Sequence, residues 1–193
     1  DLVTLRAFRG HWDLKIVKVI VPAAAAGIAL GTLSFRYLSA DHIRFIIGTF
    51  SIYVAVQQLP NSALVNNDYV PSPSKLAGRI WGAASGFSSF IAHAGGPPLS
   101  IYLLPLRLDK TIVVGTSALF FAIVNALKLI PYALLGQLHF ENLKVSLILL
   151  PVAPIGVLLG VFLHRRISNH IFYFMSYVML GLIGIKLILE SLI

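Results

Sequence analysis

Long apolar stretches separated by short polar turns run through the whole sequence. Five of them are long and apolar enough for a helix that crosses the hydrocarbon core, which takes about 20 residues. These five stretches cover residues 16–35, 43–59, 111–135, 143–163 and 171–189. A sixth apolar segment covers residues 76–106 but is interrupted by Gly95, Gly96, Pro97 and Pro98. The pattern predicts an all-α integral membrane protein, a polytopic helical bundle with one broken helix.

The most polar connection in the chain follows the second apolar stretch. Residues 61–75 are rich in asparagine and proline, a composition typical of a loop. We therefore divide the chain into three parts. Residues 1–60 hold two transmembrane helices, residues 61–75 form a linker loop, and residues 76–193 hold the broken helix and three further transmembrane helices.

An internal repeat relates the first and last parts at a fixed offset of 129 residues. The matched residues are Leu14, Lys15, Pro22, Gly27, Gly31, Arg36 and Ser39 in one copy, and Leu143, Lys144, Pro151, Gly156, Gly160, Arg165 and Ser168 in the other. The shared Gly-x3-Gly spacing places two glycines on one helix face, where a second helix can approach closely. Internal repeats are typical of secondary transporters. We interpret residues 1–60 as the second half of a first repeat and residues 76–193 as a complete second repeat.

The relative direction of the two copies depends on the broken segment. If it crosses the membrane once, the copies are parallel, and if it re-enters on one side, they are inverted. The upstream half of the second copy, residues 76–135, has almost no counterpart before Asp1. We therefore expect about 70 to 80 further residues upstream, since each copy should carry the same units. A naturally short form that pairs with a partner is the alternative.

Composition and charge support a membrane location. The chain has 58% hydrophobic and 11% charged residues, whereas a soluble domain has about 25% charged residues. The net charge of +8 has two interpretations: loop cations that set the membrane orientation, or a field that attracts anions. Assigning the cations to alternate sides of the membrane gives nearly equal totals, so the orientation stays open. The charges form no basic stripe, which argues against nucleic acid as a partner.

The glycines and prolines at the break are the strongest sign of a binding site. Proline removes a backbone donor, and it disfavours the helical conformation of the residue before it, so the helix must stop here. Non-helical backbone at membrane depth is tolerated where it is buried in protein or lines an aqueous cavity. A half-helix that starts at Pro97 directs backbone N–H groups toward an anion, although the prolines supply none themselves. A simple kink is the alternative.

Polar residues inside the apolar segments complete the predicted site. His93 can donate a hydrogen bond to an anion or carry a proton, or it can satisfy a carbonyl of the broken helix. Lys128, about a turn from Asn125, is a plausible anion ligand unless its side chain extends to the membrane surface. Ser85, Ser88 and Ser89 can bind an anion or serve close packing. The predicted substrate-binding residues are His93, Gly95, Gly96, Pro97, Thr116, Asn125 and Lys128.

The sequence lacks the usual signatures of catalysis. No apolar span contains an aspartate or glutamate, and the chain has no cysteine. No His-x3-His or Glu-x2-His pair and no Gly-x4-Gly-Lys-Ser/Thr loop is present, so we predict no metal, no cofactor and no nucleotide site. We therefore assign no catalytic residue and expect no enzyme. A membrane-embedded enzyme and a non-transporting scaffold or assembly subunit remain as alternatives to a transporter.

One run of residues resembles a known family. The sequence AHAGGPPLSIYLLP over residues 92–105, followed by Gly115-Thr116, Asn125, Lys128, Pro131-Tyr132 and Gly136, is similar to the TauE/SafE sulfite-exporter family. The match is to members with His-Ala-Gly-Gly-Pro-Pro in the second half, and it covers about the whole chain. The resemblance implies a two-repeat permease that exports sulfite, sulfonates or related organosulfur anions. Full members have a first-half copy of the glycine-rich break, which this chain lacks.

The resemblance also sets expectations for location and partners. It implies a multi-pass protein of the bacterial inner membrane. The expected partners are the lipid bilayer, a small anionic substrate and further copies of the chain in a homo-oligomer. The driving force for transport is then a proton carried by His93 or the membrane potential acting on the anion.

Overall fold

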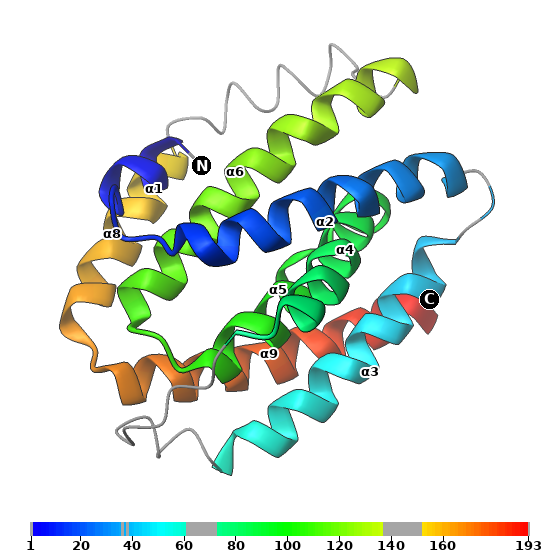
Figure 1. Cartoon of the computed structure of the whole chain (residues 1–193). Coiled ribbons are helices and arrows are strands. Elements are labelled where there is room, and N and C mark those ends of the chain that lie inside the picture. Colours follow the sequence, from blue (N-terminus) through cyan, green and yellow to red (C-terminus); the bar gives the residue numbers. More distant parts are fainter. Residues whose placement is uncertain (1, 36, 38, 61–72, 137–151, 193) are drawn as a thin grey trace.

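The computed structural model describes residues 2–35, 37, 39–60, 73–136 and 152–192. Within these ranges the chain folds into helices joined by short turns, without strands (Figure 1). The helices are α1 (Leu2–Ala7), α2 (Leu14–Ser34), α3 (Ala40–Gln58), α4 (Lys75–Ile91), α5 (Gly96–Leu103), the 3-10 helix η2 (Leu104–Leu106), α6 (Lys110–Leu134), α8 (Val152–Arg166) and α9 (Asn169–Leu192). The predicted all-α fold is confirmed.

Polar residues in the turns fix where four of the helices begin. Asp13 caps α2, Ser39 caps α3, Ser74 caps α4 and Asp109 caps α6. Each side chain accepts a hydrogen bond from a backbone N–H of the first turn, a group that has no partner within the helix. The short polar turns of the sequence therefore act as helix start signals.

Three of the described helices, α2, α6 and α9, are long and apolar enough to cross a membrane. They correspond to the stretches predicted over residues 16–35, 111–135 and 171–189. The stretch predicted over residues 43–59 forms α3, which has 19 residues. Part of the stretch predicted over residues 143–163 lies outside the described residues, and the rest belongs to α8. Helix length and composition are those of a helical membrane protein.

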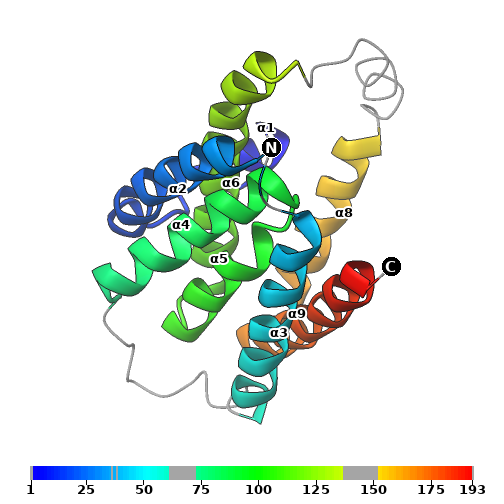
Figure 2. The same ribbon diagram turned by 90° about the vertical axis from the view of Figure 1, so that its right-hand side faces the viewer.

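Glycines let α2 and α4 pack with their backbones in contact (Figure 2). A Cβ atom on Gly27 would lie 2.1 Å from the carbonyl oxygen of Ala83. In the same way, a Cβ atom on Gly86 would lie 2.1 Å from the carbonyl oxygen of Ala24. Any side chain at these positions would push the helices apart, so the two glycines set the interhelical distance.

The two helices α2 and α4 run in the same direction. Near the start of both helices, a Cβ on Gly78 would lie 3.0 Å from the side chain of Val19. Near their ends, a Cβ on Gly31 would lie 3.1 Å from the ring of Phe90. Residues early in one helix therefore face residues early in the other.

The chain reverses after α4, because α5 returns toward the end where α4 begins. Tyr102, near the end of α5, places its hydroxyl oxygen 2.8 Å from where a Cβ on Gly78 would stand, in the first turn of α4. The following helix α6 begins at this same end, since Thr116 accepts a hydrogen bond of 3.0 Å from the backbone N–H of Asp13. The broken segment is thus a hairpin that re-enters on one side.

The helices α3 and α9 form the second close pair, and they run antiparallel. A Cβ on Gly48 would lie 2.7 Å from the carbonyl oxygen of Gly184, and a Cβ on Gly184 would lie 2.8 Å from that of Gly48. Further along α3, Ala55 faces Gly181, which precedes Gly184. The repeat offset of 129 residues maps the first residue of α3 onto the first residue of α9. Matched segments that run in opposite directions, together with the re-entrant hairpin, favour the inverted arrangement of the two copies.

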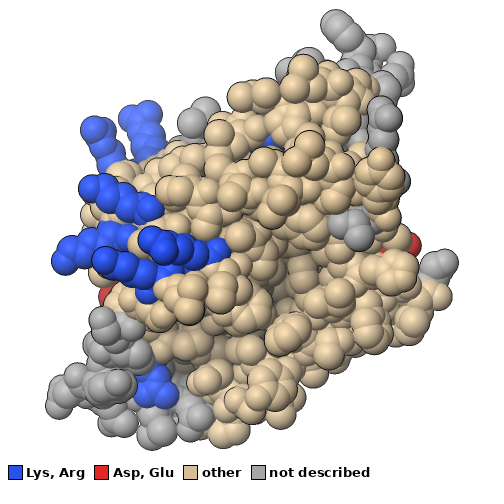
Figure 3. Space-filling model, turned by 45° about the vertical axis from the view of Figure 1, so that its right-hand side comes forward, with Lys and Arg blue, Asp and Glu red and all other residues tan. Residues whose placement is uncertain are grey.

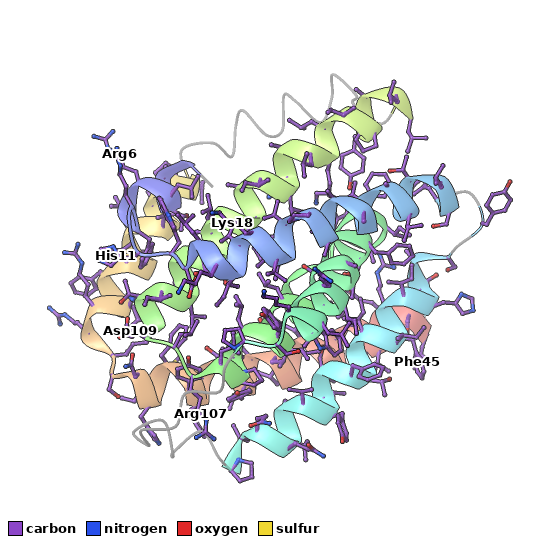
Figure 4. The ribbon with its side chains drawn as sticks, viewed as in Figure 1. Arg6, His11, Lys18, Phe45, Arg107 and Asp109 are labelled. Atoms are coloured by element: carbon purple, nitrogen blue, oxygen red, sulfur yellow. The ribbon has the colours of Figure 1, made fainter. Side chains whose placement is uncertain are left out.

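Basic side chains of the described chain gather at the end of the bundle where α2, α4 and α6 begin (Figure 3). We call this the basic end. Its lysines and arginines are Arg6, Arg9, Lys15, Lys18, Lys75, Arg79, Arg107, Lys110, Arg165 and Arg166. In Figure 4 the labelled Arg6, Arg107 and Asp109 lie on this side, and Phe45 of α3 lies on the opposite side.

The opposite end of the bundle has no such excess of charge in the described residues. Arg44 pairs with Asp41 at 2.7 Å, and Lys186 pairs with Glu190 at 3.4 Å. The sequence analysis assumed that each apolar segment crosses the membrane, and so assigned the cations to alternate sides. It missed this asymmetry because the α4–α5 hairpin returns to the end where it starts. The structure therefore shows a charge bias that the sequence analysis left open.

We expect the basic end to face the cytoplasm, because lysine and arginine are in excess on the cytoplasmic side of membrane proteins. The chain has no cysteine, so single introduced cysteines report their own location. Ala7→Cys, at the basic end, should react with a membrane-impermeant maleimide only after cells are permeabilised. Tyr37→Cys, at the opposite end and 87% exposed, should react in intact cells. The reverse labelling pattern would contradict this orientation.

Substituting a glycine at the α2–α4 contact should weaken the fold. We expect Gly86→Ala to lower the free energy of unfolding by about 1–3 kcal/mol, because the added methyl overlaps the backbone of α2. Gly156→Ala in α8 is the matched control, since nothing lies within 4 Å of its Cβ position. Thermal unfolding in detergent, followed by circular dichroism, measures both. Equal midpoints for the two variants would argue against the close contact.

Candidate functional site

The tip of the α4–α5 hairpin is a short non-helical segment over residues 92–95. His93 adopts a left-handed backbone conformation with φ 52°, which is uncommon for a residue with a side chain. This conformation turns the chain back on itself after α4. The side chain of His93 is exposed, while Ala92, Ala94 and Gly95 are buried. The tip therefore has a packed inner side and presents the histidine outward.

Two serines of α4 hold the tip in place. The Ser85 hydroxyl donates a hydrogen bond of 2.6 Å to the carbonyl oxygen of Gly95. The Ser88 hydroxyl lies 3.0 Å from the carbonyl oxygen of Ala94, and the backbone carbonyl of Ser88 accepts from the N–H of Ala94 at 3.2 Å. Both serine side chains are fully buried. The Ser85 hydroxyl therefore supplies a donor to a carbonyl of the tip, whereas the Ser88 hydroxyl lies nearest the carbonyl oxygen of Ala84 within α4, at 2.7 Å.

The two glycines at the break have different roles. A Cβ on Gly95 would lie 2.6 Å from the Cβ of Ser89, so glycine is needed there for packing. A Cβ on Gly96 would meet nothing within 4 Å, so its backbone can be approached closely. The helix α5 begins at Gly96, and Pro97 and Pro98 follow without N–H groups. Gly96 is therefore the one residue among the first three of α5 with a backbone donor.

Lys128 brings a positive charge into the packed interior beside the tip. Its side chain is only 7% exposed. The ammonium nitrogen Nζ donates to the hydroxyl of Ser89 at 2.9 Å and to the carbonyl oxygen of Ser89 at 3.2 Å. Among the described residues, ion pairs form at Arg44–Asp41 and Lys186–Glu190, and neither involves Lys128. Its charge is thus balanced by dipoles rather than by a carboxylate.

Tyr132, one turn after Lys128 on α6, makes a second contact with the end of α4. Its hydroxyl donates a hydrogen bond of 3.0 Å to the carbonyl oxygen of Phe90, and its ring stacks on the Phe90 ring with centroids 4.9 Å apart. The His93 ring lies 6.2 Å from the Tyr132 ring, centroid to centroid. One face of α6 therefore holds the end of α4 through a lysine and a tyrosine.

The structure does not bring all the predicted residues together. Asn125 precedes Lys128 by three positions, which makes the two neighbours on the α6 surface, and its side chain is exposed. Thr116 is fully buried against the start of α2, where it accepts from the N–H of Asp13. Twelve positions separate Thr116 from Lys128, which is about 18 Å along the helix. Thr116 thus lies at the basic end, away from the tip.

The hairpin tip lies level with the last turn of α2. The Phe90 ring packs edge-on against the ring of Phe35, directly after α2, with centroids 5.8 Å apart. The break is therefore nearer to the end of the bundle remote from the basic end than to its centre. Lys128 and His93 line none of the five principal cavities in the described chain. Ser89 fills the space beside the ammonium group, so an anion there has to share or displace its hydroxyl.

The sequence analysis did not assign Tyr132 and Ser89 to the predicted site. A tyrosine four positions after an intramembrane lysine, on the same helix face, is a signal that could have pointed to Tyr132. Ser89 was considered together with Ser85 and Ser88, and nothing in the sequence distinguishes the serine that contacts the lysine from the two that hold the tip. Among the described residues, no group of three or more histidine, cysteine or acidic side chains is placed to hold a metal ion.

A helical membrane bundle with a broken, re-entrant segment is an arrangement used by secondary transporters. A family profile described as Sulfite exporter TauE/SafE matches residues 2–187. The chain therefore belongs to the TauE/SafE family, a family of membrane transporters, and the resemblance seen in the sequence is confirmed. Searches of curated proteins and of solved structures found no match.

Removing the hydroxyl that holds the tip should loosen the break. We expect Ser85→Ala to lower the free energy of unfolding by about 1 kcal/mol, because the Gly95 carbonyl loses a buried donor. Hydrogen–deuterium exchange should become faster over residues 94–99. Ser176→Ala is the matched control, since that hydroxyl bonds within α9 to Phe172 and does not contact the tip. Unchanged exchange at the tip in Ser85→Ala would contradict the role of Ser85.

Proposed function

We propose that the chain acts as a secondary transporter that exports a small oxyanion of the sulfite or sulfonate class across the bacterial inner membrane. Membership of the TauE/SafE family supports the transport of such anions. The observation that carries the location of the site is the buried ammonium of Lys128, which has no carboxylate partner in the described chain.

A charge in this position favours an anionic ligand. A buried charge without a counter-charge is costly, and charged residues within membrane segments usually mark substrate or ion pathways. The oxygens of Ser89 offset part of that cost through their dipoles. A bound anion supplies the missing negative charge, so the ligand and Lys128 stabilise each other.

The proposed site includes further donors, at the tip and on α6. The backbone N–H of Gly96, the amide of Asn125 and the ring of His93 are groups that can donate to an oxyanion. Pro97 and Pro98 have no N–H, so Gly96 supplies the backbone donor at the start of α5. Sulfite and sulfonates present three oxygen acceptors, and several donors from two elements suit them better than a single contact.

Lys128 also has a structural role, and the two roles have to be separated. Its ammonium group bonds to the Ser89 carbonyl near the end of α4, where a cation is favourable because of the helix dipole. Replacement by alanine removes this contact as well as the charge. Replacement by glutamine removes the charge but keeps an N–H donor, on a side chain that is one atom shorter.

The test is flux of labelled sulfite and methanesulfonate in proteoliposomes. We expect Lys128→Gln and Lys128→Ala to reduce transport about tenfold or more, because a hydrogen bond to a charged group is worth about 1.5–3 kcal/mol. Lys128→Arg should retain part of the flux. Lys186→Gln is the matched control, since Lys186 lies in α9 with its side chain 72% exposed and is paired with Glu190.

Two outcomes would overturn the proposal. One is full transport by a folded Lys128→Gln variant, which would remove the charge from the mechanism. The other is no flux of any tested anion by the folded parent protein. A His93→Ala variant whose transport keeps the same pH dependence would remove the histidine as a proton carrier while leaving the anion site standing.

A further inference from the structure

A groove on the outer surface between α2 and α4 combines two cations with an apolar floor. The groove has a volume of about 580 Å³. Lys18 and Arg79 lie at one end, and Pro22, Ala23, Ala26 and Ala83 form the floor. None of the residues of the proposed anion site lines it.

The groove follows from the close packing of α2 and α4. The glycine contacts bring the two backbones together, and a Cβ on Gly82 would lie 2.8 Å from the carbonyl oxygen of Ile20. The outward neighbours of these contacts are alanines and a proline, which are too small to fill the surface between the helices. A shallow apolar channel therefore remains along the helix pair.

The two cations lie at the same level of the bundle. Lys18 is four positions after the first residue of α2, and Arg79 is four positions after the first residue of α4. Because the helices are parallel and begin at the same end, both side chains are about 6 Å inside the helix starts. Both side chains are exposed, and neither has an ion pair or hydrogen bond within the described chain. Figure 4 labels Lys18 on α2 near its start.

We propose that this groove binds an anionic phospholipid of the leaflet at the basic end. The headgroup phosphate lies between Lys18 and Arg79, and one acyl chain follows the floor past Pro22, Ala26 and Ala83. The level of the two cations, one turn inside the helix ends, matches the boundary between headgroups and acyl chains. The apolar floor distinguishes this ligand from a free anion, which would leave the channel empty.

The charge around the groove supports the same partner. Lys15 and Lys75 lie one turn nearer the helix starts, so further positive charge adjoins the end of the groove that holds Lys18 and Arg79. Clusters of lysine and arginine next to membrane helices attract anionic lipids. The lipid site depends only on membrane insertion and on the α2–α4 pair. A test of lipid binding is therefore independent of which substrate the protein transports.

The test compares lipid selectivity of the parent and two double variants in vesicles. Spin-labelled phosphatidylglycerol and phosphatidylcholine are the probes, and electron spin resonance gives their relative association constants with the protein. We expect the parent to prefer phosphatidylglycerol several-fold. Lys18→Gln/Arg79→Gln should reduce the preference to near one. Arg6→Gln/Arg9→Gln, which removes the same charge from the same end but outside the groove, should retain most of it.

A third variant tests the acyl-chain part of the site without changing charge. Ala26→Trp fills the exposed floor of the groove and should displace the tightly held lipid while the weaker attraction of the surface remains. Equal loss of selectivity in both double variants would overturn the proposal, because it would show diffuse attraction by the whole basic end. Release of the labelled lipid by millimolar inorganic phosphate or sulfite would also overturn it, in favour of a soluble anion.

Discussion

The arrangement around residues 92–95 depends on one requirement. Backbone carbonyls at a helix break inside a membrane protein must accept hydrogen bonds from other groups. In the hydrocarbon core of a bilayer there is no water to donate to these carbonyls, so donors from the protein must bond to them. Three carbonyls at the break accept hydrogen bonds from side chains: those of Ser89 and Phe90 from α6, and that of Gly95 from Ser85 of α4. The position of α6 against α4 and the return path of α5 both depend on these hydrogen bonds.

This constraint explains why one lysine is both structural and a candidate ligand. The ammonium of Lys128 satisfies the Ser89 carbonyl, but its charge exceeds what a carbonyl and a hydroxyl can neutralise. Tyr132 donates a hydrogen bond to the Phe90 carbonyl in the same way, but with a neutral hydroxyl. A neutral donor would therefore have sufficed for the fold at Lys128, and the proposal that this position binds an anionic substrate rests on the extra charge.

Much of the fold could be predicted from the sequence, because apolar length and helix start signals are local properties. The break before Pro97 was also predictable from the run of two glycines and two prolines, whereas the single prolines Pro22 and Pro131 lie inside α2 and α6. The direction taken after the break was not, because it depends on contacts between residues far apart, such as Tyr102 with Gly78. The charge asymmetry was hidden for the same reason. Thr116 carries no local sign that its partner is the backbone of Asp13 rather than the tip.

The antiparallel contact of α3 with α9 bears on how such a chain could arise. Gly48 and Gly184 approach each other reciprocally, in helices that the repeat offset makes counterparts. If the predicted repeat reflects a duplication, the same contact would earlier have joined two separate copies of one ancestor, inserted in opposite directions and related by a two-fold axis in the membrane plane. A protein that inserts both ways needs balanced charge at its two ends. In that case the excess of lysine and arginine at the basic end arose after the duplication, when fusion into one chain had fixed the direction of each half.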